Sequence, residues 1–264
     1  MSDKPDNNYS TQEGFYTSPP VQEPPPPPQI KIRMPDNKPY VVYVIMGITI
    51  LVYLAQMAAE LLFGYDLVSI YGMKVNEYIY MGEYWRLITP VFLHGNLMHI
   101  GFNMYALYAL GPQMERFYGS WQFLLLYLAC GFGGVVASFA LTDAPSVGAS
   151  TAIFGLLGAY GIFSYLNQKV FGERAKRSLN SVIRIAVINL MIGLTPGIDN
   201  WGHMGGLIAG MIIAWFGGPV FELVGDVFSM RTENTRTDNQ LLAAVMISTL
   251  FFGAIAWYLI FTNT

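Results

Sequence analysis

Seven long apolar segments alternate with short polar stretches along this chain. They cover approximately residues 40–63, 94–114, 121–141, 147–166, 179–194, 201–220 and 241–261. A helix needs about 17–25 mainly apolar residues to cross a bilayer, and most of these segments satisfy that length. The pattern predicts an all-α polytopic membrane protein with a six-helix core and a seventh, C-terminal transmembrane helix.

The stretches between these segments predict the remaining organisation. Residues 64–93 mix charged residues with aromatic ones such as Tyr71, Tyr78 and Trp85, so we expect them to lie at the membrane interface. Residues 1–38 are polar and proline-rich, which favours a disordered cytoplasmic tail. We therefore divide the chain into this tail, the six-helix core (39–220), a cytoplasmic linker (221–240) and the seventh helix (241–264).

Composition and charge support a membrane location and fix an orientation. Only 12% of the residues are charged, whereas an ordinary soluble domain carries about 25%. With the N-terminus inside, the basic residues fall on the cytoplasmic side except Lys74 and Arg86. This bias predicts a cytoplasmic N-terminus and an external C-terminus in the plasma (inner) membrane. A net charge of −3 with dispersed basic residues gives no indication of nucleic-acid binding.

With this orientation, four reactive side chains lie at one depth. His99 and Asn103 fall in the outer half of the second segment, Ser150 lies near the outer end of the fourth, and His203 lies near the outer end of the sixth. Ionisable residues inside membranes are rare and usually functional. The convergence predicts a single site near the outer face of the membrane.

The chemistry of these residues indicates a nucleophile and a base. A serine hydroxyl needs a base to accept its proton, and a neutral imidazole near pH 7 is the usual one. We therefore predict a catalytic dyad of Ser150 and His203. Asp143 and Asp199 lie in outer loops without a placement that aims them at the histidine, so no acidic third member is expected. Phe154, one turn after Ser150, could pack on the imidazole or simply fill the core.

The second segment supplies candidate hydrogen-bond donors. His99 and Asn103 are four residues apart and share a helix face. Aimed at Ser150, they and the Ser150 amide would form an oxyanion hole. His94 is closer to the surface and is expected to orient the loop or the start of the helix.

Small residues explain how the fourth and sixth segments could meet. Gly155 and Gly158 leave one side of the fourth helix without bulky side chains. Gly206 and Gly210 follow His203 as a stripe on one face of the sixth helix. Small residues let helix backbones approach closely within a membrane. The stripe predicts that the two helices pack together and bring Ser150 within reach of His203.

Metal and aspartyl chemistry are less consistent with the pattern. The five-residue spacing of His94 and His99 does not match the usual helical pair of metal ligands, and no carboxylate or cysteine joins them. An aspartyl intramembrane protease would need two aspartates within the apolar segments, which contain none. A transporter is disfavoured because no internal repeat is visible. We expect no metal and no cofactor.

Taken together, the motifs resemble those of the rhomboid family of intramembrane serine proteases over residues 85–220. The matching positions are Trp85-Arg86, His94, His99, Asn103, Gly111, Glu115, Gly119, Gly148-Ala149-Ser150-Thr151, Gly202-His203, Gly206 and Gly210. Two positions depart from the usual family pattern: Thr151 replaces a frequent glycine, and Phe154 replaces a frequent tyrosine. The seventh segment resembles the six-plus-one arrangement of bacterial and secretory-pathway rhomboids.

The resemblance implies a function and a role for each residue. Ser150 would be the nucleophile and His203 the general base, with His99, Asn103 and the Ser150 amide stabilising the oxyanion. The supporting residues would be His94, Phe154, Trp85, Arg86, Glu115, Gly148, Gly206 and Gly210. The expected partners are the bilayer and transmembrane protein substrates, cleaved near the outer face. The alternative is a non-catalytic rhomboid-like binder or chaperone of membrane helices.

Overall fold

The computed structural model describes residues 2, 37–226 and 230–263. Apart from residues 2, 37 and 38, the predicted disordered tail lies outside the described residues.

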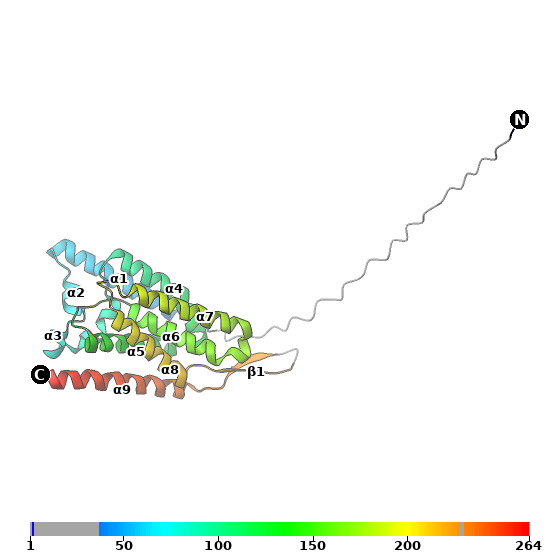
Figure 1. Cartoon of the computed structure of the whole chain (residues 1–264). Helices are drawn as coiled ribbons and strands as arrows, with labels where there is room; N and C mark the ends of the chain where they lie inside the picture. The colour runs from blue at the N-terminus through cyan, green and yellow to red at the C-terminus, as the bar shows by residue number, and fades with distance from the viewer. Residues whose placement is uncertain (1, 3–36, 227–229, 264) are drawn as a thin grey trace.

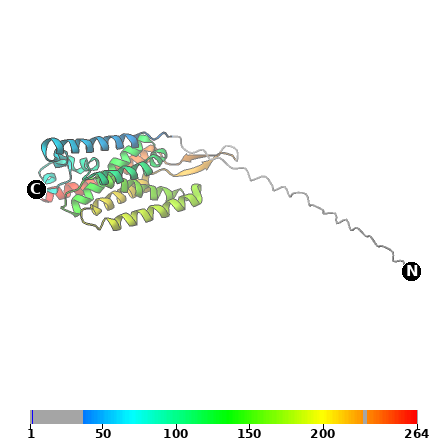
Figure 2. The same ribbon diagram turned by 90° about the horizontal axis from the view of Figure 1, so that it is seen from above.

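Within the described residues, the long helices run side by side and form a bundle (Figures 1 and 2). They are α1 (Val41–Phe63), α4 (Leu97–Tyr118), α5 (Ser120–Leu141), α6 (Ser150–Leu166), α7 (Gln168–Ile192), α8 (Asn200–Gly217) and α9 (Asp238–Asn263). By length and composition, α1, α5 and α9 could each cross a membrane, and α6 is a shorter apolar helix. The predicted all-α polytopic membrane fold is confirmed.

Short elements occupy the two ends of the bundle. Between α1 and α4 lie α2 (Leu67–Gly72), α3 (Asn76–Tyr80) and the 3₁₀ turns η1 (Tyr84–Leu87) and η2 (Thr89–Phe92). Strands β1 (Phe221–Val224) and β2 (Arg231–Asn234) form an antiparallel hairpin before α9. Figure 1 shows α2 and α3 at the same end as the C-terminus, with the hairpin at the opposite end.

The surface of the bundle is apolar where lipid would contact it. Leu61 and Leu62 at the end of α1 are 86% and 74% exposed, and Leu250 and Trp257 on α9 are both 68% exposed. In water such exposed apolar surface would be unfavourable. Hydrocarbon chains would cover it at no cost, as expected of a membrane protein.

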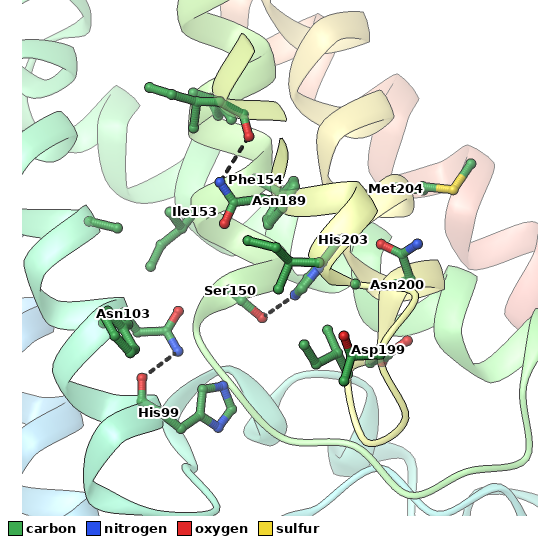
Figure 3. Close-up of a pocket in the computed structure, with 18 of the residues that line it drawn as sticks. His99, Asn103, Ser150, Ile153, Phe154, Asn189, Asp199, Asn200, His203 and Met204 are labelled. Atoms are coloured by element: carbon green, nitrogen blue, oxygen red, sulfur yellow. Dashed lines mark hydrogen bonds between the residues drawn. The ribbon is translucent and has the colours of Figure 1, made fainter. Parts of the chain in front are cut away.

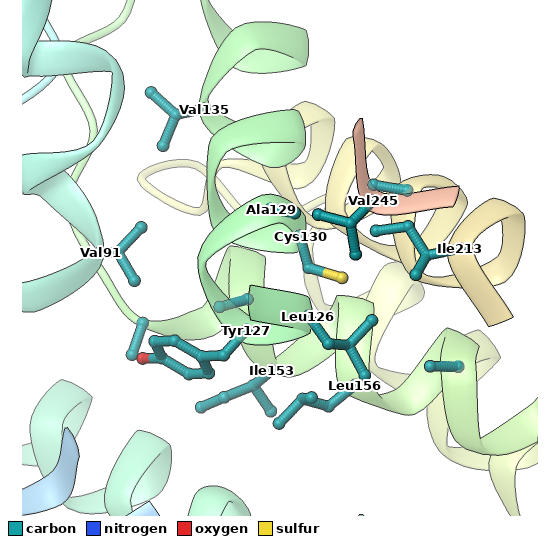
Figure 4. Close-up of a cluster of buried hydrophobic side chains, with 14 of the residues drawn as sticks. Val91, Leu126, Tyr127, Ala129, Cys130, Val135, Ile153, Leu156, Ile213 and Val245 are labelled. Atoms are coloured by element: carbon teal, nitrogen blue, oxygen red, sulfur yellow. The ribbon is translucent and has the colours of Figure 1, made fainter. Parts of the chain in front are cut away.

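The core is built around α5, which packs against α6, α8 and α9. Phe123, Leu126, Tyr127 and Cys130 of α5 are completely buried, and Figure 4 shows several of them among side chains of α6, α8 and α9. Cys130 is a free thiol inside this cluster, as expected for a small packing residue.

Helices α6 and α8 approach so closely that their backbones touch. A methyl group on Gly206 would overlap the carbonyl of Thr151, and one on Gly210 would overlap the carbonyl of Gly155. Within a bilayer, close packing of this kind is a main source of helix association. The predicted stripe of small residues is therefore the line along which α6 and α8 meet.

Glu115 of α4 holds the start of α1. Its carboxylate accepts the backbone N–H groups of Tyr40, Val41 and Val42 at 2.8–2.9 Å and the Ser120 hydroxyl at 2.6 Å. The first N–H groups of a helix have no partner inside the helix and favour negative charge. Glu115 thus caps α1 from a neighbouring helix.

Arg86 and Trp85 organise the segment between α1 and α4. The Arg86 guanidinium is buried, donates to the carbonyls of Met73 and Ile70 at 2.8 Å, and pairs with Glu83 at 2.6 Å. The Trp85 indole donates to the Tyr71 carbonyl at 2.9 Å. Both residues therefore shape this segment from within it.

Lys74 joins this segment to the loop that precedes α6. Its ammonium donates to the carbonyls of Thr142 and Ala144 at 2.5 and 3.0 Å, and its backbone forms a two-way bridge with Ser146. The side chain is fully buried. Burial lowers the pKa of Lys74 from its ordinary value of 10.5 to about 8, against the opposing effect of nearby carboxylates, chiefly Asp199.

Two helix starts differ clearly from those predicted. The second segment becomes helical only at Leu97, because the Asn96 side chain accepts the His99 N–H and caps the helix, so His94 lies before α4. Helix α7 begins at Gln168, far earlier than expected, because its first half is polar and gives no apolar signal. The helix is kinked at Gly172, whose φ of 53° is not helical.

The segment predicted as a linker contains the β1–β2 hairpin. Asn167, at the end of α6, holds its base: its amide donates to the Pro219 carbonyl and its side-chain oxygen accepts the Phe221 N–H. Arg236 donates to the carbonyls of Ala214 and Gly218 at the end of α8. The four-residue strands were too short to be recognised in the sequence, and β2 is also polar throughout.

Replacement of Gly210 by alanine should destabilise the bundle. The added methyl has no room against the Gly155 carbonyl, so α6 and α8 must separate, at a cost of about 1–3 kcal/mol. Thermal unfolding in detergent would measure the loss. Gly253→Ala on α9 is the matched control, because a methyl there meets nothing within 4 Å. Equal unfolding temperatures for the two variants would contradict the packing argument.

The buried Lys74 should make stability rise with pH above about 8. Its pKa is about 8 in the folded protein and 10.5 ordinarily. Between pH 8 and 10.5 the Lys74 side chain is therefore mostly protonated in the unfolded chain and mostly neutral in the folded protein. The unfolded state binds more protons in this range, so raising the pH stabilises the folded state. The free energy of unfolding of the wild type, relative to Lys74→Gln, should increase by up to about 1.4 kcal/mol per pH unit between pH 8 and 10.5. A pH-independent difference would contradict the assignment.

Candidate active site

A glycine turn places Ser150 at the start of α6. Gly148 has a φ of 136°, which side chains rarely allow, and its N–H donates to the Pro90 carbonyl at 2.8 Å. A Cβ atom on Gly148 would lie 2.8 Å from His99 Nε2 and 3.4 Å from Ser150 Oγ. The glycine therefore supplies both the turn and the space beside the hydroxyl.

His203 lies on the first turn of α8 and reaches Ser150. Asp199 caps this helix through its Oδ1 atom, which accepts the Gly202 N–H at 2.8 Å. The imidazole is buried, and its Nε2 atom is 2.9 Å from Ser150 Oγ (Figure 3). The distance is a hydrogen bond. The two residues predicted to form a dyad therefore lie in direct contact.

The hydrogen bond constrains the protonation of the imidazole. If the Ser150 hydroxyl donates to Nε2, the ring proton must be on Nδ1. Among the described residues, neither His203 Nδ1 nor Asp199 Oδ2 has a hydrogen-bond partner. The Asp199 carboxylate caps α8 through Oδ1, and the described residues show no hydrogen bond between it and the imidazole.

Phe154 stacks on the imidazole. The two ring centroids are 4.2 Å apart and the ring planes differ by 8°. Phe154 and Ser150 lie one turn apart on α6, so one helix supplies both the hydroxyl and the surface against which the imidazole rests. Of the two interpretations given to Phe154, the structure favours contact with His203.

His99 and Asn103 line the same cavity from α4. The close approach of His99 Nε2 to Gly148 puts its ring beside the turn that carries Ser150. The Asn103 amide donates one hydrogen bond to the His99 carbonyl at 3.0 Å, within its own helix (Figure 3). An amide nitrogen has two N–H groups, so Asn103 retains a donor. In the described part of the chain, neither side chain forms a hydrogen bond to Ser150.

His94 connects α1 to the turn before Ser150. Its backbone N–H and carbonyl pair with the Gln56 side chain at 3.1 and 3.0 Å, while its Nε2 atom accepts the Ala149 N–H at 3.4 Å. Gln56 is buried in α1 and also donates to Asp66 and Ser69. His94 thus lies behind the site and joins its loop to α1.

A cavity of about 1700 Å³ extends from the Ser150–His203 pair along the bundle. Its walls come from α4, α6, α7 and the loop 193–199. At its other end lie Gln113, Tyr160 and Ser178. The volume exceeds the 300–1,000 Å³ of typical small-molecule pockets. Its length along three helices is suited to a polypeptide segment.

The polar residues at the far end of the cavity (Gln113, Tyr160 and Ser178) and the hydrogen bonds of Gln56 were not predicted from the sequence. A glutamine within the first apolar segment and one in the second are signals that could have been noticed, since polar residues at membrane depth usually have a partner. Which partner each one contacts depends on helix packing.

Comparison with known proteins identifies the family. The sequence model of the Rhomboid domain matches residues 81–220. This chain belongs to the rhomboid family. It is 46% identical over 145 residues to "Rhomboid protease GluP" of Bacillus subtilis (strain 168), an alignment that covers 54% of this chain and 28% of GluP.

Two further relatives differ in how much of their length this rhomboid matches. "RHOMBOID-like protein 9, chloroplastic" of Arabidopsis thaliana is 35% identical over 155 residues, covering 58% of this chain and 36% of the relative. "Putative rhomboid protease YdcA" of Bacillus subtilis (strain 168) is 32% identical over 152 residues, covering 57% of this chain and 73% of the relative. The chain therefore spans well under half of GluP and of the plant protein.

Loss of the Phe154 ring should slow the reaction of Ser150. In Phe154→Ala the imidazole loses its stacked support, and misplacement of this kind typically lowers reactivity by about 10- to 100-fold. Phe154→Tyr keeps the ring and should restore most of the rate. The measurement is the rate at which a fluorophosphonate probe labels Ser150 in detergent. Labelling of Phe154→Ala at the wild-type rate would show that the stack does not position His203.

Proposed function

We propose that this rhomboid is an intramembrane serine endopeptidase that cleaves transmembrane segments near the outer face of the membrane. The main support is the 2.9 Å contact between Ser150 Oγ and His203 Nε2 at one end of a cavity long enough for a polypeptide. The names of the relatives GluP and YdcA are consistent with this activity.

The proposed reaction passes through an acyl-enzyme. Ser150 Oγ attacks the scissile carbonyl carbon while its proton passes to His203 Nε2. The C–N bond then breaks, and the imidazolium returns the proton to the departing amine. A water molecule, deprotonated by His203, attacks the ester and releases the acid. The serine recovers its proton, so the dyad ends as it began.

The oxyanion of each tetrahedral intermediate needs donors that are already in place. We assign this role to the Ser150 backbone N–H, the His99 side chain and the free N–H of Asn103. Support comes from the position of His99 beside Gly148 and from the presence of both side chains in the cavity wall. A substrate carbonyl placed over Ser150 would lie between α4 and α6.

The proposed location is a plasma (inner) membrane, with the N-terminus in the cytoplasm and the C-terminus outside. The distribution of basic residues supports this orientation. The Ser150–His203 pair then lies near the outer end of the bundle, and water reaches it from outside, because the bilayer interior holds none. The proposed substrates are single-pass or polytopic membrane proteins whose segments can unwind at the scissile bond.

The second candidate is a non-catalytic binder or chaperone of membrane helices. The same cavity favours it, since a bound helix need not be cut. The dyad argues against it, because a binder has no use for a serine hydroxyl held 2.9 Å from an imidazole nitrogen.

Removal of either dyad residue should abolish proteolysis. The full chain in liposomes should cleave a transmembrane reporter, and Ser150→Ala and His203→Ala should each lower the rate by at least about 10⁴-fold. Ser164→Ala, a serine replacement on the same helix outside the cavity lining, is the matched control and should cleave normally. A fluorophosphonate probe should label wild type and not Ser150→Ala.

If the wild type failed to cleave and failed to react with the probe, yet all four proteins bound the reporter helix equally, the binder would replace the protease as the leading function.

A further inference from the structure

A polar cluster lies at the end of the cavity away from the dyad. It consists of Gln113 on α4, Tyr160 on α6 and Ser178 on α7. The Gln113 amide donates to the Tyr160 hydroxyl at 2.9 Å, and that hydroxyl donates to Ser178 Oγ at 3.1 Å. All three residues line the cavity. Three different helices therefore contribute to one hydrogen-bonded chain.

The cluster is well separated from the reacting groups. Tyr160 follows Ser150 by ten residues on the continuous helix α6, which corresponds to about 15 Å at a rise of about 1.5 Å per residue. The cluster therefore lies toward the end of the bundle away from Ser150, where Arg177 directly precedes Ser178 in α7. None of its members belongs to the dyad or to its proposed donors.

The cluster retains one free acceptor and one free donor. Tyr160 uses its hydroxyl both to accept and to donate. The side-chain oxygen of Gln113 accepts no hydrogen bond within the described ranges, and the Ser178 hydroxyl, which accepts from Tyr160, donates to no partner there. Gln113 is exposed and Ser178 is half-buried, and both line the cavity, so these groups are accessible to a ligand in it. The free pair is complementary to a group that offers an N–H and a carbonyl together.

We propose that this cluster is a specificity subsite for a carboxamide side chain, asparagine or glutamine, in the transmembrane segment of the substrate. Because the subsite is about 15 Å inward of Ser150, the residue would lie about ten helical positions inward of the scissile bond. The inference rests on the proposed proteolysis, since it assumes that a substrate helix occupies the cavity.

The neighbouring charge suggests one competing ligand. Arg177 also lines the cavity and is exposed, with its Nε donating to the Glu173 carbonyl. A guanidinium would favour a carboxylate over an amide. A carboxamide is the better fit to the free acceptor on Gln113, which would repel an anion.

A positional scan of the substrate tests the subsite. Reporters with a polyleucine transmembrane segment would carry a single Asn at each position from four to sixteen residues inward of the scissile bond. The wild type in liposomes should cleave the reporter with Asn near position ten about fivefold faster, in kcat/KM, than the all-leucine reporter, as expected for one hydrogen-bonded contact within a membrane. The preference should fade toward both ends of the scan.

Variants of the cluster should remove this preference. Tyr160→Phe keeps the ring that packs near Phe163 but breaks both hydrogen bonds. In Tyr160→Phe and in Ser178→Ala the ratio of the Asn to the all-leucine rate should fall to about one. Tyr165→Phe is the matched control: it lies on the same helix, stacks on Trp215, is absent from the cavity wall, and should keep the fivefold ratio.

A binding measurement separates the subsite from the protease. Ser150→Ala in liposomes would be titrated with fluorescent Asn and all-leucine helices, and Ser150→Ala/Tyr160→Phe would be compared. If the wild type cleaves no reporter, the proposed proteolysis fails, but about fivefold tighter binding of the Asn helix, lost with Tyr160→Phe, would still support the subsite. Equal cleavage and equal binding at every position would overturn it, as would a stronger preference for Glu than for Asn.

Discussion

The backbone contact between α6 and α8 is the constraint on which the rest of the structure depends. At Gly206 and Gly210 there is no room for even a methyl group, because carbonyls of α6 occupy the space. Ser150 begins α6 and His203 is on the first turn of α8. The separation of these two side chains is therefore set by how closely the two helices pack. A larger residue at Gly206 or Gly210 would push α6 and α8 apart and lengthen the 2.9 Å contact between Ser150 Oγ and His203 Nε2.

A second set of contacts fixes the turn that carries Ser150 against its surroundings. His94 and Pro90 bind the backbone at Ala149 and Gly148, and His94 is held in turn by Gln56 of α1. Lys74 ties the loop before this turn to the segment between α1 and α4. The side chains that are candidates for chemistry are thus few, and most of the buried polar groups around them serve to hold backbone in place. This division is what a preorganised site requires.

The cavity joins two environments that differ in chemistry. At one end are the proposed nucleophile, Ser150, and the candidate donors, where a peptide bond would be cut and water is needed. About 15 Å along α6 is a chain of hydrogen bonds from Gln113 through Tyr160 to Ser178. A substrate that satisfies both ends must unwind at one and present a polar side chain at the other. The protein would then select its substrates by features along the whole transmembrane segment of the substrate.

The sequence by itself determined the all-α membrane fold and the packing stripe, because bilayer thickness limits helix length and glycine spacing is local information. It allowed Ser150 and His203 to be paired, since each lies near the start of its helix, and it left the contact of Phe154 open. It misplaced the starts of α4 and α7 and missed the hairpin, because the Asn96 cap and the Asn167 contacts are formed by side chains whose partners cannot be recognised from composition. Only the tertiary structure decided that Asp199 caps a helix, that Glu115 holds the start of α1, and that Gln113, Tyr160 and Ser178 meet. Each of these depends on the direction of a side chain between packed helices, and hydrophobic periodicity carries no information about that direction.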